Sequence, residues 1–198
     1  MSDLAKHKDT RRKLLDAGIE LFSEQGYAAT GLKQILNKVG VPKGSFYNYF
    51  DSKEAFGAAI LDEYVDFLVA RVKFYVSDET TPAIERIRLI HLEIIEFVEA
   101  SNALNGCLVG RMAAEIGHGL SGVSKSLTGG FERWIAGYVQ LLEEAQAVGD
   151  VRRDVSAKDL ADIFWNQWQG SLLQMRIYGS TRPLKTGLSI LLDQMFRP

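Results

Sequence analysis

The sequence has few of the residues that build covalent or metal-held frameworks. Its 198 residues include one cysteine, Cys107, and three histidines, His7, His91 and His118. One thiol forms neither an intrachain disulfide nor a multi-thiolate zinc site, and the histidines are too scattered along the chain to indicate a metal cluster. We therefore expect no bound metal and no cofactor.

Long apolar runs and prolines are also scarce. No stretch reaches the roughly 18 uncharged apolar residues of a membrane helix, and the N-terminal segment is charged where a signal peptide has an apolar block. With 46% hydrophobic residues, 24% charged residues and 4 prolines, the composition is typical of a folded protein. We expect a cytoplasmic chain without a membrane partner.

Charge is distributed unevenly along the chain. The net charge is -2, which on average argues against nucleic-acid binding. However, residues 1–56 carry nine Lys and Arg against seven Asp and Glu, whereas residues 57–198 carry fourteen against eighteen. The N-terminal quarter is therefore the part that could present a basic face to phosphates.

Apolar spacings of three and four residues run through the whole sequence, and no segment shows the alternation of a half-buried strand. We predict an all-α protein of about nine helices. The pair Gly129 and Gly130 is expected to kink or split the seventh helix. The expected ranges are residues 9–25, 31–40, 45–50, 53–76, 82–101, 107–116, 123–148, 156–178 and 184–196.

Residues 30–50 have the dimensions of a helix-turn-helix, with Pro42 and two glycines in the turn. Phe46 and Phe50 are four residues apart and can both face a core. Other faces offer hydroxyls and an amide for phosphates or base edges, from Ser45, Tyr47, Asn48 and Tyr49. The same pattern also fits a small helical hairpin that binds no DNA.

The string GYAATGLKQILNKVGVPKGSFYNYFDSKEAF, residues 26–56, resembles the DNA-binding domain of TetR-family transcriptional repressors. Shared features are an aromatic residue after the glycine, a capping threonine, "VGV" and "KG" across the turn, "YNYF", and "SKE" opening a long helix. Two positions depart from the family pattern: Gly31 replaces a second hydroxyl residue, and Leu36 stands where alanine is common. Clear resemblance covers about residues 9–60.

The resemblance implies a DNA-binding domain at residues 1–52 and an effector-binding and dimerisation domain at residues 53–198. Thr30 and Tyr47 would grip phosphates, and Lys43 and Lys53 would add charge-assisted contacts. The remaining expected DNA-binding residues are Gly44, Ser45, Asn48 and Tyr49. One helix-turn-helix contacts few base pairs, so we expect a homodimer on a palindromic duplex operator.

Two apolar stripes near the C-terminus are candidates for the dimer interface, since family members pair through their last two helices. They consist of Leu160, Phe164, Trp168 and Leu172, and of Leu184, Leu188, Leu191, Leu192 and Met195. The alternative interpretation is that both stripes belong to the core of one protomer.

A small, largely apolar or reactive effector is expected to release the operator. Candidate lining residues are Tyr64, Phe67, His91, Met112, Trp134, Trp165 and Trp168, although such residues also form ordinary cores. Cys107 stands at the expected start of a helix, where the dipole makes a thiol more reactive. The segment NGCLVGRMAAEIG resembles a branch of the family that senses electrophiles or oxidants, while the alternative is a small buried hydrophobic residue.

Other classes of function are less well supported by the sequence. There is no GxSxG or phosphate-loop pattern, so we do not expect an enzyme. A helical protein-interaction module that binds no DNA is the alternative, and an activator instead of a repressor also stays open. Binding to duplex DNA that weakens with salt separates a regulator from an interaction module.

Overall fold

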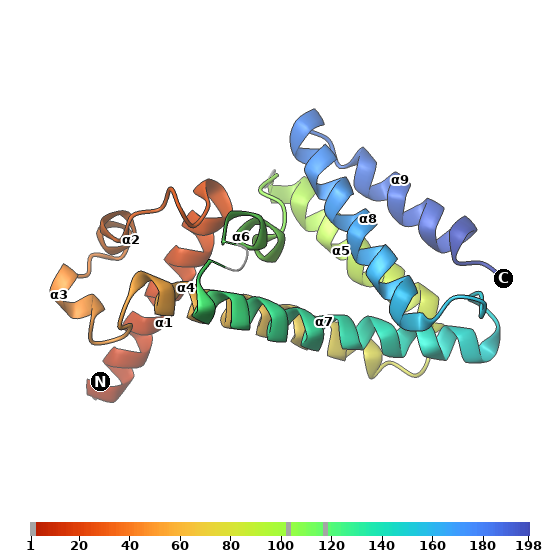
Figure 1. Ribbon diagram of the computed structural model, residues 1–198, viewed down its shortest axis with the longest axis horizontal. Helices are drawn as coiled ribbons and strands as arrows, with labels where there is room; N and C mark the ends of the chain where they lie inside the picture. Colours follow the sequence, from red (N-terminus) through yellow and green to blue (C-terminus); the bar gives the residue numbers. More distant parts are fainter. Residues whose placement is uncertain (1–2, 102–103, 117–118) are drawn as a thin grey trace. The chain divides into compact units, whose positions relative to one another are not determined.

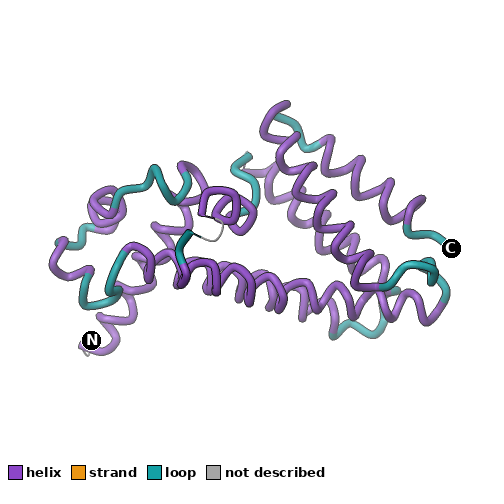
Figure 2. Tube along the Cα trace, viewed as in Figure 1, coloured by secondary structure: helices purple, strands orange, loops and turns teal. Residues whose placement is uncertain are grey.

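The computed structural model describes residues 3–101, 104–116 and 119–198, so His118 lies outside the described residues. Within these ranges the regular structure consists of nine α-helices and one π-helical turn, with no strand (Figure 1, Figure 2). The helices are α1 (Asp3–Gln25), α2 (Leu32–Val39), α3 (Lys43–Phe46), α4 (Lys53–Val76), α5 (Ala83–Ser101), α6 (Leu108–Ile116), α7 (Ser121–Val148), α8 (Ala157–Tyr178) and α9 (Arg182–Ile190), and the π-helical turn is η1 (Leu191–Met195).

The all-α prediction is confirmed, and the caps explain why most helices end close to their predicted positions. Ser156 caps α8 by accepting the Asp159 N–H at 3.1 Å, and Gly179 ends it in the left-handed conformation. The seventh helix was predicted to kink or split at Gly129 and Gly130; it is not split, because α7 continues through both glycines. A Cβ at Gly130 would lie 3.0 Å from the Val65 side chain, so this glycine permits close packing of α4 and α7.

The described residues form two compact units. The first unit combines the chain up to Asp66 with Cys107–Gly130, and the second combines Phe67–Gly106 with Phe131–Pro198. The predicted boundary after residue 52 isolates the helix-turn-helix, whereas packing joins that motif to α6 and to the first turns of α4 and α7. This grouping is not visible in the sequence, because α6 lies far from the motif along the chain.

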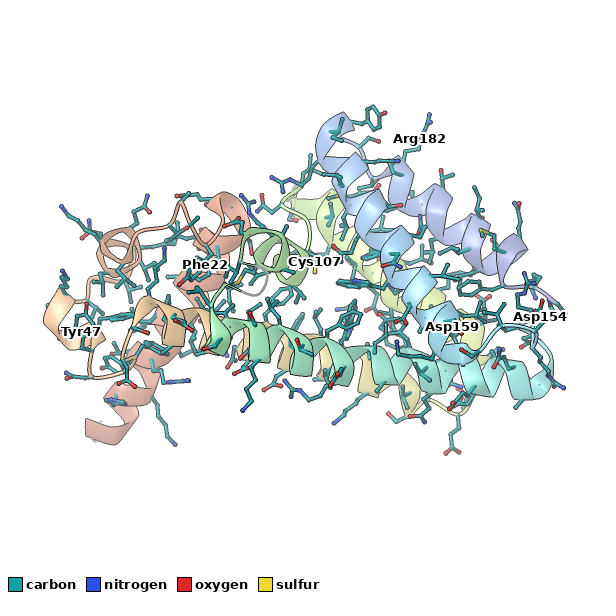
Figure 3. All side chains as sticks on the ribbon, in the orientation of Figure 1. Phe22, Tyr47, Cys107, Asp154, Asp159 and Arg182 are labelled. Atoms are coloured by element: carbon teal, nitrogen blue, oxygen red, sulfur yellow. The ribbon has the colours of Figure 1, made fainter. Side chains whose placement is uncertain are left out.

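Aromatic side chains form the core of the first unit. Phe22, Phe46 and Phe56 are fully buried, and the ring of Phe56 lies 5.5 Å from Phe46 and 6.0 Å from Phe22. Figure 3 shows Phe22 among these packed side chains. A Cβ at Gly18 would lie 2.3 Å from Ile60 Cδ1, so α1 and α4 approach so closely that a larger residue at this position would force buried side chains of α4 to move.

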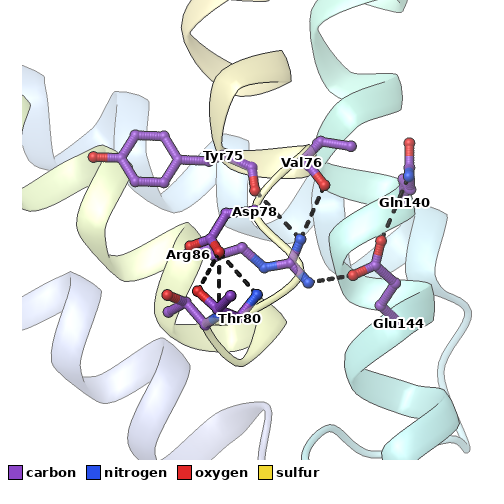
Figure 4. A network of polar contacts seen from close by, with 8 residues as sticks. Tyr75, Val76, Asp78, Thr80, Arg86, Gln140 and Glu144 are labelled. Atoms are coloured by element: carbon purple, nitrogen blue, oxygen red, sulfur yellow. Dashed lines mark hydrogen bonds and ion pairs between the residues drawn. The ribbon is translucent and has the colours of Figure 1, made fainter.

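The second unit is built around α5, α7, α8 and α9, with one buried charge near its edge. Arg86 of α5 donates to the carbonyls of Tyr75 and Val76 at 3.3 and 3.1 Å, and it pairs with Glu144 of α7 (Figure 4). These carbonyls belong to the last turn of α4, where no later N–H group of the helix is available to donate to them. Arg86 therefore ties the end of α4 to two other helices, since a buried charge requires such partners.

None of the described helices is both long and apolar enough to cross a bilayer. In the same ranges, no three His, Cys, Asp or Glu side chains gather in a way that could hold a metal ion.

Candidate nucleic-acid interface and effector site

The helix-turn-helix is shaped by its turn residues. Gly40 ends α2 with φ of 71°, and Pro42 has the extended conformation that precedes α3. The Ser45 N–H donates to the Pro42 carbonyl at 2.9 Å. The α3 helix begins two residues earlier than predicted and is shorter. It ends early because residues 47–49 form a turn, in which the backbone N–H groups of Asn48 and Tyr49 donate to carbonyls three residues earlier.

Neighbouring residues of α3 and the following turn face opposite ways. Phe46 is fully buried, whereas Tyr47 is 50% exposed and lies at the edge of the unit in Figure 3. Lys43, Gly44 and Asn48 are also exposed. This face therefore offers a phenol, an amide and an ammonium group to a ligand, while the phenylalanine holds the segment on the core.

Space and charge on this face suit a polyanion. No atom lies within 4 Å of where a Cβ at Gly44 would be, so another backbone can approach it closely. Ser45 and Tyr49 are half-buried, and the Tyr49 ring lies 4.3 Å from the ring of His7. Lys43 has no ion pair with any described residue, whereas Lys38 is bound to Glu20 at 2.7 Å, which raises the pKa of that lysine.

Two residues predicted to contact phosphate are engaged with the protein. Thr30 is fully buried and its hydroxyl donates to the Gly26 carbonyl at 2.6 Å, which contradicts the expected phosphate contact. Gly31, not Thr30, is the N-cap of α2. The Lys53 ammonium donates to the Tyr27 carbonyl at 2.7 Å and lies 4.4 Å over the Tyr27 ring, and burial lowers the pKa of this lysine.

An aromatic cluster in the second unit contains most of the predicted effector residues of that unit. His91 lies 4.4 Å from the Trp168 ring and 4.6 Å from the Phe164 ring, and Trp134 lies 4.6 Å from Trp165. Tyr138, which is not among the effector residues predicted from the sequence, completes the cluster. The space that these rings enclose is too small for a water molecule, so the cluster is closed in this conformation.

Burial controls the chemistry of His91. It lowers the pKa of His91 to about 4, and the nearby Arg71 acts in the same direction. The Nδ1 atom lies 2.9 Å from the Ile87 carbonyl, so this nitrogen carries the proton and donates it to that oxygen. The histidine is therefore neutral and held within its own helix.

The other predicted effector residues divide between the two units. Tyr64, Cys107 and Met112 belong to the first unit, where the half-buried Tyr64 contacts Cys107, and burial raises the pKa of its phenol. Met112 is fully buried. Phe67 belongs to the second unit and is 61% exposed, which contradicts its predicted place in the lining of a pocket.

The predicted dimer stripes are the core of the protomer. Leu160, Phe164, Trp168, Leu172, Leu184, Leu188, Leu191 and Leu192 are all buried within one chain, and only Met195 is exposed. The alternative interpretation of these stripes is therefore the correct one. Different apolar residues of the same two helices are exposed, namely Ile163, Leu173, Ile177, Tyr178 and Ile190.

A groove runs between α8 and α9 beside these exposed residues. Its volume is about 870 Å³. Small residues form part of it, and the Ser171 hydroxyl donates to the Pro183 carbonyl at 3.1 Å across it. Its lining residues are Gln167, Gly170, Ser171, Gln174, Tyr178, Ser180, Arg182, Pro183, Thr186 and Gly187.

A helix-turn-helix with a buried aromatic side and an exposed polar side, followed by a larger helical unit, defines a DNA-binding regulator. Comparison with known proteins agrees. Residues 14–60 match the model of bacterial regulatory proteins of the tetR family, and residues 83–191 match the tetracyclin repressor-like C-terminal domain. The chain belongs to the TetR family, and its helix-turn-helix is a DNA-binding domain.

Similar proteins cover nearly the whole chain. The HTH-type transcriptional repressor DhaR of Mycobacterium sp. (strain GP1) is 32% identical over 93% of this chain and 91% of its own length. A regulatory protein TetR from Rhodobacter sphaeroides superposes with a TM-score of 0.85, at 32% identity over 92% and 96% of the two chains. The reduced form of E. coli NemR superposes with a TM-score of 0.85, at 28% identity over 93% and 96%.

Proposed function

We propose that the chain is a homodimeric repressor that binds a palindromic operator and releases it when a small, largely apolar or reactive effector binds. The observation that carries this proposal is the opposed placement of Phe46 and Tyr47. Burial of one ring fixes the segment, and exposure of the next presents Tyr47, Lys43 and Asn48 to a duplex.

Binding to DNA is tested with a duplex that the wild-type protein selects from a random-sequence library. Fluorescence anisotropy should show affinity that falls with added salt, since released counterions accompany phosphate contacts. Tyr47→Ala should weaken binding by roughly tenfold. Lys158→Ala, which changes an exposed lysine of α8, is the matched control and should bind like the wild type. Failure of the wild type to select any duplex contradicts the proposal.

The homodimer is proposed to form through the outer face of α8 and α9. Exposed Leu173, Ile177 and Tyr178 of α8, together with Ile190 of α9, provide apolar area beside the groove, and such patches are typical of interfaces. Two copies would then supply two helix-turn-helix motifs to half-sites about 34 Å apart. Sedimentation at micromolar concentration should give a dimer, and a monomer contradicts this part of the proposal.

The effector is proposed to enter the aromatic cluster around His91. The three tryptophans of the chain, Trp134, Trp165 and Trp168, all lie in this cluster, so selectively excited tryptophan fluorescence reports on it alone. Because the cluster is closed, a ligand must displace a ring, and this displacement is the proposed origin of the conformational change. Cinnamaldehyde, which is both aromatic and electrophilic, is a suitable probe. It should quench tryptophan fluorescence and weaken operator binding together.

Cys107 is a second proposed sensing group. Its carbonyl accepts the Arg111 N–H at 3.0 Å, so the residue caps α6, and its side chain is half-buried beside Tyr64. One similar protein, E. coli NemR, was crystallised in its reduced form. N-ethylmaleimide should weaken operator binding by the wild type and leave Cys107→Ser unaffected. Equal loss in both proteins contradicts a role for this thiol.

We propose that the chain acts by binding and not by catalysis, in the cytoplasm where its operator lies. Its relatives are transcriptional regulators. A helical interaction module without DNA binding is the alternative, and duplex binding that falls with salt distinguishes the two.

A further inference from the structure

Helix α6 carries a charged pair that faces the helix-turn-helix. Arg111 and Glu115 are four residues apart, so they share one side of α6. The Arg111 Nε donates to Glu115 Oε1 at 3.2 Å, and the two side chains are only 18% and 25% exposed. This shielding distinguishes the pair from the exposed pairs of the same spacing, such as Lys158 with Asp162.

Arg111 closes the end of α1. Its Nη1 donates to the carbonyls of Ser23 and Glu24 at 3.0 and 3.3 Å. Carbonyls in the last turn of a helix have no helical donor, and a cation at that end also interacts favourably with the helix dipole. The guanidinium therefore fixes the point at which α1 ends.

Glu115 holds the next residues of the chain. Its Oε2 accepts the Ala28 N–H at 3.0 Å. Gly26 has φ of 90°, a conformation that favours glycine, and a Cβ there would lie 2.0 Å from Glu115 Oε1, so a larger residue would displace the carboxylate. The corner between α1 and α2, residues 23–28, is thus held by two side chains from a helix more than eighty positions later in the sequence.

This corner leads directly into the helices that face DNA. The Thr30 hydroxyl donates to the Gly26 carbonyl at 2.6 Å, and Gly31 then caps α2. Because Gly26 is fixed against Glu115 on one side and against Thr30 on the other, the start of α2 depends on the pair in α6. Any movement of the corner changes the direction in which α2 and α3 leave it.

We infer that Arg111 and Glu115 are positioning residues for operator recognition: they hold the α1–α2 corner so that α2 and α3 meet the duplex in one orientation. This inference rests on the proposed contact of α3 with DNA.

The test compares specific with non-specific duplex binding, because phosphate attraction alone is insensitive to the orientation of α3. In Glu115→Leu the Ala28 N–H and the Arg111 guanidinium lose their shared acceptor. Affinity for the selected duplex should fall roughly 10- to 100-fold. Affinity for a scrambled duplex should change by less than about threefold. The specificity ratio therefore decreases.

Conservative and paired variants sharpen the result. Glu115→Gln keeps an oxygen that accepts the Ala28 N–H, so it should retain most of the specificity that Glu115→Leu loses. Arg111→Met combined with Glu115→Leu should lose no more than the worse single variant, because the two side chains act as a unit. Lys158→Met and Asp162→Asn, which remove the exposed pair in α8, are controls that should leave both affinities unchanged.

The outcomes separate the two proposals. A wild-type protein that selects no duplex refutes the proposed function. A wild type that binds its selected duplex, with folded Glu115→Leu binding it equally well, overturns the inference about α6. A lower melting temperature with an unchanged specificity ratio also overturns it, since that result is a purely structural role. If Glu115→Leu does not fold, the specificity ratio of Arg111→Met decides by the same criterion.

Discussion

Each unit contains a pair of adjacent residues of which one is buried and the other exposed. The sequence predicts this difference in exposure for one pair and not for the other. Phe46 is buried and Tyr47 exposed in the helix-turn-helix, and Leu172 is 6% exposed beside Leu173 at 60% in α8. In α3 the polar residues around the phenylalanine identify the buried side. In α8 the apolar residues surround the helix, so periodicity alone does not say which of them face inward.

A row of apolar residues along a helix therefore predicts which side is buried only when the opposite side of the helix is polar. The residue spacing of both predicted C-terminal stripes is equally typical of a dimer interface and of a protomer core. The protomer buries the stripe that packs α8 on α5 and α9, and the exposed residues of the other side are what remain for a second copy. The choice depends on the packing of helices distant in sequence.

The largest expected effect separates Phe46 from Tyr47. Phe46→Ala empties a fully buried position and should lower the free energy of unfolding by about 3–5 kcal/mol. Tyr47→Ala should change it by less than about 0.5 kcal/mol. Urea unfolding followed by circular dichroism measures both. Equal destabilisation would show that Tyr47 belongs to the core and would remove it from the proposed DNA-binding face.

The same comparison in α8 uses Leu172 and Leu173. Leu172→Ala should cost about 2–5 kcal/mol of unfolding free energy, because the side chain is buried within the protomer. Leu173→Glu should leave the protomer folded and convert a dimer into a monomer, since it places a charge in the proposed interface. Phe74→Glu, at an exposed apolar residue of α4 outside the proposed interface, is the control. Sedimentation that still gives a dimer for Leu173→Glu contradicts the proposed interface.

A smaller effect is expected from pH at the aromatic cluster. The unfolded chain takes up a proton on His91 near its ordinary pKa of 6.5, whereas the folded protein does so only near 4. The free energy of unfolding should therefore fall as pH drops from about 6.5 to about 4, by up to roughly 3 kcal/mol. His91→Phe keeps an aromatic ring and should lose this part of the pH dependence. An unchanged dependence would mean that His91 is not the titrating group.

The smallest expected effect concerns the proposed phosphate contact of Lys43. Lys43 has no ion pair with any described residue, whereas Lys38 is bound to Glu20. Lys43→Ala should reduce the slope of log affinity against log salt by about 1. Lys38→Ala should reduce it less, because its charge is already partly neutralised. Equal slopes in all three proteins would place Lys43 outside the DNA contact.

The sequence specified local structure well where the signal lies within one or two turns of helix. The caps at Ser156 and Gly179, the turn at Gly40 and the burial of Phe46 and Phe50 follow from nearby residues. The predicted phosphate contact of Thr30 is wrong, because its hydroxyl donates to the carbonyl of Gly26, the residue directly after α1. A capping residue and a buried anchor have the same appearance in a sequence.

By itself the sequence determined that the chain is helical, where most of its helices begin and end, and that residues 30–50 form a helix-turn-helix, because caps, turns and amphipathic spacing act over a few residues. Only the tertiary structure decided that α6 supports the α1–α2 corner through Arg111 and Glu115, that the tryptophans close around His91, and which side of α8 is covered. These features depend on contacts between residues far apart in the chain, and no local pattern encodes which distant helix supplies the partner.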